Sequence, residues 1–214
     1  MTTAPLTPDE LLTTTRSVRR RLDLTRPVPD ALVRECLETA LQAPSGSNRQ
    51  GWHWLMLTDP AVRAEVGEYY RQSFARYYSS GATAATQHAG DPERAAVQQR
   101  VTESALYLSE HMGEVPVLML ACIEAGDLPD GNQAGLWGSL LPAAWSYMLA
   151  ARARGLGTAW TTLHLVHERE IAGLLGLPDG IRQGVLMPTA YYTGETFRPA
   201  SRLPLDQVLH VNHW

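Results

Sequence analysis

The chain has 214 residues, of which 44% are hydrophobic and 19% are charged, and its formal net charge is -4. All 18 basic residues are arginine, so the chain contains no lysine. This excludes the internal Schiff base of a pyridoxal enzyme, the lysine of a Walker A loop and a kinase-type catalytic lysine.

The length and composition favour one globular domain, residues 1–214. A slightly acidic chain gives no reason to expect a nucleic-acid partner, and no segment reaches the roughly 18 apolar residues of a membrane span. The first residues do not resemble a secretion signal, so we expect a cytoplasmic protein. Cys36 and Cys122 stand alone in apolar stretches, which favours buried thiols over a disulfide or a nucleophile.

The first half of the chain predicts four helices and one strand. Thr7, Pro8 and Glu10 form a capping-box pattern, which predicts a short helix that ends near the arginine run at 16–21. The stretch from about Ser79 to Gly90 is small, polar and aperiodic, which predicts a mobile surface connection. The other expected elements are a helix after Pro29 that stops at Pro44, a strand at 52–57, and helices starting at Asp59-Pro60 and Asp91-Pro92.

The second half predicts five more elements and a tail. The apolar run at 115–123 indicates a strand buried on both faces. We then expect a helix at 133–154 that ends at Gly155 and an extended piece at 157–163. After these come a helix at 167–175 closed by Gly176 and a strand near 184–192. The tail, 197–214, contains Pro199 and Pro204 and is expected to run over the protein surface.

Three separate segments carry more functional groups than a scaffold needs. In the first, Ser17 lies between Arg16 and Arg19, and a hydroxyl beside two planar guanidinium groups suits a phosphate or the edge of a heterocycle. A solvated basic surface would give the same run. The second, residues 43–52, is rich in turn formers but also holds two amides and two hydroxyls, which suit a flat ligand with alternating donors and acceptors.

The third segment, residues 155–162, follows a helix. A helix C-cap explains Gly155 and a tight turn explains Gly157. The segment lacks the full G-x-G-x-x-G pattern and does not open a helix, so a Rossmann dinucleotide site is disfavoured.

Taken together and in this order, the segments resemble the nitroreductase family of FMN-dependent oxidoreductases. The matching motifs are R-S-V-R from Arg16, A-P-S-G-S-N-R-Q-G-W from Ala43, G-L-G-T from Gly155 with a following Thr pair, and F-R-P-A-S-R-L-P from Phe197. The resemblance implies an α+β fold with a mixed, mainly antiparallel sheet flanked by helices. It also implies an intertwined homodimer that holds FMN at the subunit interface.

The resemblance assigns the cofactor contacts residue by residue. Arg16, Ser17 and Arg19 would contact the flavin phosphate and pyrimidine edge, and Arg202 would bind the phosphate. Backbone groups of Thr161, Thr162 and Leu163 would face the flavin edge near N5. The residues expected to line the ring of the other subunit's flavin are Pro44, Ser45, Gly46 and Asn48.

The activity that the resemblance implies is reduction of nitroaromatic, quinone or similar small acceptors with NADH or NADPH, by hydride transfer through flavin N5. Because the flavin carries this chemistry, no catalytic side chain is expected. Two alternatives remain open: a flavoenzyme of the same fold with another chemistry, such as reductive dehalogenation or dehydrogenation of a specialised metabolite, or a flavin-binding protein without turnover.

Some residues allow two interpretations. His164 and His167 lie three apart, but no Cys or carboxylate supplies a third ligand at helical spacing, so we predict no metal site. Tyr70, Phe74 and Tyr77 follow helical spacing, which favours a core or dimer face over a lid above the flavin. The same ambiguity applies to Trp137 and Trp145.

Overall fold

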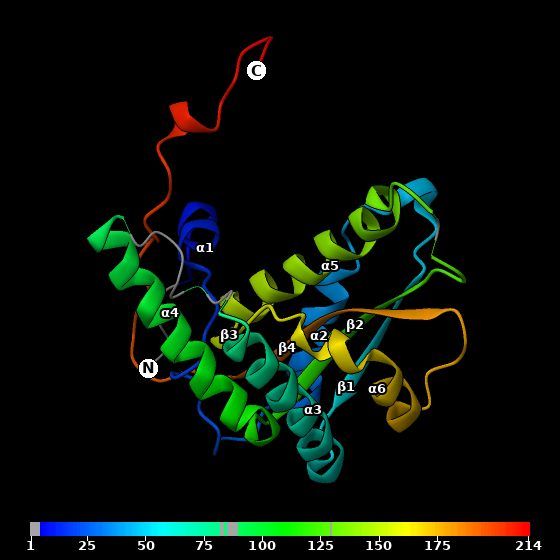
Figure 1. Cartoon of the computed structure of the whole chain (residues 1–214). Helices are drawn as coiled ribbons and strands as arrows, with labels where there is room; N and C mark the ends of the chain where they lie inside the picture. The colour runs from blue at the N-terminus through cyan, green and yellow to red at the C-terminus, as the bar shows by residue number, and fades with distance from the viewer. Residues whose placement is uncertain (1–4, 82–83, 85–89, 129) are drawn as a thin grey trace.

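The computed structural model describes residues 5–81, 84, 90–128 and 130–214 (Figure 1). The helices are α1 (Pro8–Thr14), α2 (Asp30–Ala40), α3 (Pro60–Ser79), α4 (Pro92–His111), α5 (Ala134–Ala153) and α6 (Glu168–Leu175). The strands are β1 (Trp52–Leu57), β2 (Val117–Glu124), β3 (Leu156–Thr158) and β4 (Ile181–Tyr191). Short 3-10 turns are η1 (Gly46–Asn48), η3 (Met112–Glu114), η4 (Leu163–His167) and η5 (Leu205–Gln207). Most of the predicted connection at 79–90 lies outside the described residues.

Side-chain caps set the helix starts where the sequence predicts them. Thr7 and Glu10 form a capping box at α1. The side chains of Asp59 and Asp91 accept hydrogen bonds from the first turns of α3 and α4, each of which begins with proline. These caps satisfy N–H groups that have no partner within the helix, so the predicted starts are confirmed.

The four strands form one sheet in the order β1-β2-β4-β3, and all neighbours run antiparallel. The predicted α+β fold with a mainly antiparallel sheet is thereby confirmed. Two predicted boundaries are wrong: β4 begins at Ile181, before residue 184, and β3 ends at Thr158, after which the chain turns into η4. Beyond β3, Ala159 N–H donates to the Pro188 carbonyl at 3.3 Å and Thr161 bridges to Leu186, so the extended piece predicted at 157–163 stops before η4.

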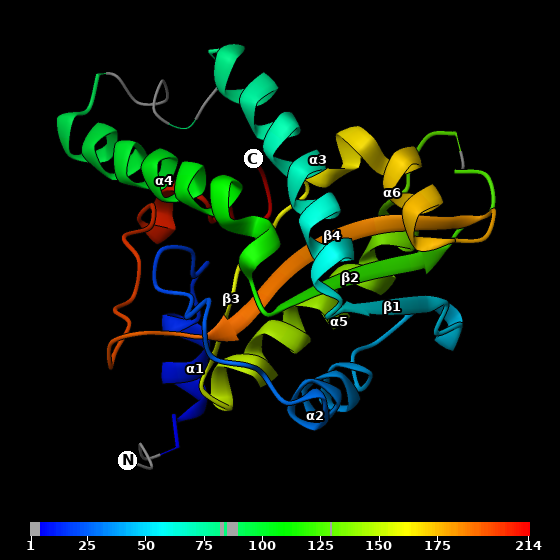
Figure 2. The same cartoon turned by 90° about the horizontal axis from the view of Figure 1, so that it is seen from below.

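Helices cover both faces of the sheet (Figure 2). Alternate residues of β2 enter two apolar clusters, with Met119 on the face covered by α2 and α5, and Leu120 on the face covered by α3 and α6. This explains the uninterrupted apolar run that predicts β2. Cys36 and Cys122 are buried free thiols, one in each cluster, as predicted. No helix of the described residues is long and apolar enough to cross a membrane.

The tail differs from its prediction. Instead of running over the surface, it leaves the body of the molecule beside α1 (Figure 1). Its apolar side chains are exposed, with Leu205 at 66%, Val211 at 73% and Trp214 at 101% relative exposure. The physical reason is that the described residues of a single chain give these side chains no apolar surface to pack against.

Candidate functional site

The segment that carries Arg16, Ser17 and Arg19 is fixed to the edge of the sheet. The Val18 N–H donates to the Thr158 carbonyl at 2.7 Å, and the Val18 side chain is buried. A Cβ atom on Gly157 would lie 3.0 Å from Val18 Cβ. Gly157 is therefore needed for the close approach of Val18, and the tight turn expected there is wrong because the residue lies within β3. The G-L-G-T motif thus positions the arginine segment.

A pocket of about 560 Å³ gathers four of the predicted site residues, a volume typical of small-molecule sites. They come from the first segment and from the tail. The lining residues are Thr15, Arg16, Ser17, Arg19, Val101, Trp145, Met148, Trp160 and Arg202. We call this the arginine pocket.

The three guanidinium groups of the arginine pocket have no acidic partner. Arg16 Nη1 donates to the Arg198 carbonyl at 2.8 Å, and Arg202 Nη1 donates to the Ser201 carbonyl at 3.1 Å. Among the described residues, no ion pair involves Arg16, Arg19 or Arg202. Within the described part of the chain no ion pair compensates the positive charge at the pocket, which favours an anionic ligand.

Arg19 is the most enclosed of the three cations. Its Nη1 donates to Ser104 Oγ of α4 at 3.3 Å, and burial lowers the pKa of the guanidinium while nearby Tyr70 raises it. For Tyr70, burial has the opposite effect and raises the pKa to about 12, although Arg19 and a hydrogen bond with Thr161 both lower it. Since an arginine remains protonated in proteins, Arg19 supplies a fixed positive charge. Tyr70 and Phe74 are buried in α3, as the core interpretation predicts.

The segment after β3 holds Thr161, Thr162 and Leu163, none of which is among the residues that line the arginine pocket. Thr161 N–H and C=O pair with Leu186 at 3.1 and 3.0 Å, and its hydroxyl donates to the Leu186 carbonyl at 2.8 Å. Thr161 is buried, whereas Thr162 is exposed and Leu163 is half-buried. Thr161 therefore anchors the segment through its own hydrogen bonds, and Trp160 connects it to the arginine pocket.

The loop that holds the other predicted site residues lies outside the arginine pocket of the same chain. Its backbone has positive φ at Ser47 (53°), Asn48 (52°) and Gln50 (53°), a conformation costing about 1–2 kcal/mol for most residues. Hydrogen bonds hold it, with Gly46 N–H donating to Ser139 Oγ at 2.9 Å and Gln50 N–H to Ser45 Oγ at 3.1 Å. Strained backbone of this kind concentrates at functional sites. The predicted residues on it, Pro44, Ser45, Gly46 and Asn48, lie at or near the surface.

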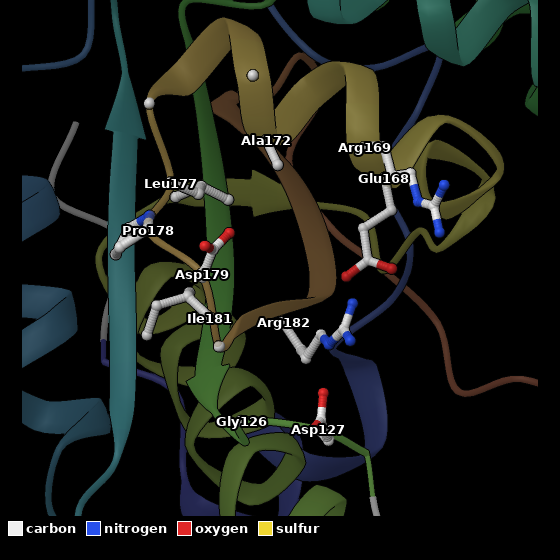
Figure 3. A pocket seen from close by; sticks show the side chains of 13 residues that line it. Gly126, Asp127, Glu168, Arg169, Ala172, Leu177, Pro178, Asp179, Ile181 and Arg182 are labelled. Carbon is white, nitrogen blue, oxygen red and sulfur yellow. The ribbon is translucent and has the colours of Figure 1, made fainter.

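A second pocket, of about 890 Å³, is larger but chemically different (Figure 3). It lies between α6 and the adjoining ends of β2 and β4, and we call it the acidic pocket. Three carboxylates line it together with two guanidinium groups, and Figure 3 shows Arg182 between the carboxylates of Glu168 and Asp127. The other charged residues there are Arg169 and Asp179. None of the predicted site residues is among those that line it.

Sequence reasoning left some residues of the arginine pocket unassigned. Trp145, whose role the sequence left open, and Met148, which it did not single out, belong to α5, an apolar helix whose sequence does not show which side faces a ligand. Trp160 lies inside the third motif, between Thr158 and Thr161, and this proximity could have identified it. Val101 comes from α4, where only the packing of the helix beside Arg19 reveals its position.

The histidine pair is buried in η4. His164 is fully buried, and burial lowers its pKa to about 3, so it is neutral near pH 7. His167 Nδ1 lies 3.2 Å from Glu170 Oε1. Within the described part of the chain, no group of three His, Cys, Asp or Glu residues is arranged to hold a metal ion.

The fold agrees with comparisons to known proteins. The family model for the nitroreductase family matches residues 12–191. The chain therefore belongs to the nitroreductase family and is an oxidoreductase of that family. It is 29% identical over 196 residues to a Thermus thermophilus protein named NADH dehydrogenase, covering 91% of this chain and 90% of that protein.

Solved structures share the fold at lower identity. One is oxidised iodotyrosine deiodinase bound to FMN and 3-iodo-L-tyrosine, with a TM-score of 0.68, 21% identity, and coverage of 96% of this chain and 98% of that one. Another is a mutant of an FMN- and NADPH-dependent nitroreductase from Sphigopyxis sp. strain HMH, with a TM-score of 0.69, 20% identity, and coverage of 98% and 100%.

Proposed function

We propose that this chain is an FMN-dependent oxidoreductase that uses NADH or NADPH to reduce nitroaromatics, quinones or similar small acceptors. The observation that carries the proposal is the arginine pocket, where three guanidinium groups without acidic partners line one cavity in a nitroreductase-family fold. Bound FMN would supply the chemistry by accepting a hydride at N5 from the nicotinamide and passing it to the acceptor, so that both substrates use one site in turn.

The donor set of the arginine pocket suits FMN. A phosphate monoester carries about −1.5 to −2 charges and is bound well by planar guanidinium groups, here Arg16 and Arg202, with the Ser17 hydroxyl beside them. Arg19 would lie near flavin N1 and the C2 carbonyl and stabilise the negative charge that reduction places there. Thr162 and Leu163 would face the N5 edge, held in place by Thr161.

We further propose that the chain is one FMN-binding domain that works as an intertwined homodimer. Pro44, Ser45, Gly46 and Asn48 would contact the flavin of the second subunit. Two observations support this: the loop is exposed and strained, and the tail presents uncovered apolar side chains that a second copy of the chain would bury.

Anaerobic stopped-flow mixing tests the proposal. Protein reconstituted with FMN is mixed with NADH or NADPH while the visible absorbance of the oxidised flavin is followed, and a nitroaromatic or quinone is then added. The proposal predicts bleaching by at least one donor and recovery with the acceptor. Bound FMN that neither donor bleaches would indicate a flavin-binding protein without turnover, and protein that takes up no FMN would contradict the whole proposal.

A reductive dehalogenase is the second candidate, because iodotyrosine deiodinase shares the fold. A halotyrosine is a zwitterion and requires charged groups above the flavin. Glu68 and Arg71, on α3, instead form an exposed ion pair with each other at 2.6 Å. Steady-state turnover of nitro compounds against halotyrosines separates the two candidates.

A further inference from the structure

Two arginines that the proposed function does not use lie where β4 passes into the tail. Arg21 Nε donates to the Thr193 carbonyl at 2.6 Å, and its Nη1 donates to the Thr196 carbonyl at 2.9 Å. Arg152, at the last turn of α5, is 8% exposed and donates from Nη1 to the Tyr192 hydroxyl at 2.5 Å. No carboxylate of the described residues forms an ion pair with either.

Both guanidinium groups contact the ring of Phe197. The Cζ atoms of Arg21 and Arg152 lie 4.1 and 4.8 Å from its centroid, and the Tyr192 ring meets it edge-on at 4.8 Å. Arg21 Nη2 and Arg152 Nε are buried without a hydrogen-bond partner among the described residues. Aromatic faces therefore replace the missing anions, since a ring attracts a cation placed over it. We call Arg21, Arg152, Tyr192 and Phe197 the aromatic clamp.

The backbone approaches the clamp closely at Gly194. Gly194 has a φ of +79°, and a Cβ atom there would lie 2.9 Å from Arg21 Nη2. Phe197 is also the last residue of the chain that packs against the apolar core. The residues from Ser201 onward are exposed, so the clamp determines where the tail begins.

In the chain, the clamp directly precedes the part of the tail that contacts and lines the arginine pocket. The next residue, Arg198, accepts the hydrogen bond from Arg16 Nη1 at 2.8 Å, and five residues after Phe197 comes Arg202, which lines the pocket. Movement of Phe197 would shift both the carbonyl that orients Arg16 and the backbone that carries Arg202.

We infer that Phe197, held by Arg21 and Arg152, is a positioning residue that orients Arg16 and Arg202 toward the phosphate of FMN. The inference rests on the proposed function, and its ligand chemistry is a phosphate monoester on a flavin. Because Phe197 acts through the phosphate contacts alone, it should affect the affinity for FMN and leave the affinity for riboflavin, which lacks the phosphate, unchanged.

The test compares FMN with riboflavin by titration of flavin fluorescence. Phe197→Leu should weaken FMN binding by about tenfold while riboflavin binding stays within about twofold of wild type. Phe197→Tyr, which keeps the ring, should restore FMN binding. Phe74→Leu is the matched control, because Phe74 is the other phenylalanine of the chain and is buried in α3. The ratio of its affinities for FMN and riboflavin should remain that of wild type.

The outcomes separate the two proposals. Wild-type protein that binds neither flavin overturns the proposed function. Wild-type protein that binds FMN, with Phe197→Leu affecting both flavins equally or neither, overturns only the positioning role. If Phe197→Leu does not fold, as judged by circular dichroism, Arg152→Met keeps the ring and removes one guanidinium. Arg152→Met should then weaken FMN binding more than riboflavin binding. An unchanged ratio of the two affinities would overturn the inference.

Discussion

The arginine pocket and the acidic pocket differ in how their charges are balanced. The arginine pocket, about 560 Å³, contains three guanidinium groups and no carboxylate. The acidic pocket, about 890 Å³, sets three carboxylates against two guanidinium groups. Pocket size would select the second as the ligand site. Charge selects the first, because uncompensated guanidinium groups bind an anion whereas mixed charges largely cancel.

The two pockets also differ in how rigidly the chain holds them. Val18, Gly157 and Thr161 fix the arginine pocket to β3 and β4 through close contacts and hydrogen bonds. The acidic pocket is lined by four glycines, of which Gly126, Gly173 and Gly176 have open space where a Cβ would stand. A site that must hold a cofactor in one orientation needs close contacts and hydrogen bonds such as those at the arginine pocket.

The largest effect that distinguishes the pockets concerns FMN affinity. Arg202→Ala removes a charge-assisted contact to the phosphate and should weaken FMN binding by about 10- to 100-fold, measured by fluorescence titration. Arg182→Ala in the acidic pocket is the matched control and should bind FMN like wild type. Equal losses in both variants would show that the pocket charges do not select the cofactor.

Glycine substitutions test the difference in support. Gly157→Ala forces a Cβ against Val18 and should lower the free energy of unfolding by about 1 to 3 kcal/mol, measured by urea denaturation. Gly173→Ala, in α6 at the acidic pocket, meets nothing within 4 Å and should raise that free energy by about 0.5–1 kcal/mol. A stable Gly157→Ala protein would contradict the close-approach role of this glycine.

His164 makes the connection between the pockets sensitive to acid. It lies in η4, between Thr162 and Glu168, and burial lowers its pKa from 6.5 to about 3. The unfolded chain therefore takes up a proton below pH 6.5 that the folded chain does not bind, so stability falls as the pH drops from 6.5 toward 3.

This loss of stability should be about 1 kcal/mol between pH 6.5 and 5.5 and should approach about 1.4 kcal/mol for each further pH unit. Urea denaturation at pH 6.5 and 5.5 measures it. His164→Leu should remove this part of the slope, and His111→Gln, at a partly exposed histidine of α4, should keep it. A slope that is the same in His164→Leu and wild type would refute the assignment.

The smallest expected effect concerns the flavin reduction potential. Arg19→Gln removes the positive charge near N1 and should lower the two-electron potential by about 20 mV, determined by anaerobic dye equilibration. Arg169→Gln removes an exposed charge at the acidic pocket and should leave the potential unchanged. A potential that rises in Arg19→Gln would exclude Arg19 from the pyrimidine edge.

Local chemistry explains which features the sequence could predict. Caps such as Thr7 with Glu10 depend on neighbours three residues apart, and the apolar run of β2 reflects burial on both faces, so both are readable from the chain. The motif order likewise predicted that Arg16, Ser17, Arg19 and Arg202 would share one site, and the structure brings them together.

The remainder depends on contacts between distant residues. The need for Gly157 arises from Val18, about 140 residues away in the chain. Trp145 and Met148 reach the pocket from a helix that is apolar on all sides, where no periodicity marks the ligand face. The tail was misjudged because prolines indicate extended backbone but do not reveal which surface, if any, it follows.

A crystal structure of the protein with FMN tests the central claim most directly. The account predicts electron density for the phosphate between Arg16 and Arg202, with the loop Pro44–Asn48 of a second copy of the chain beside the ring. Density for FMN in the acidic pocket, or at a site that one chain completes alone, would contradict it.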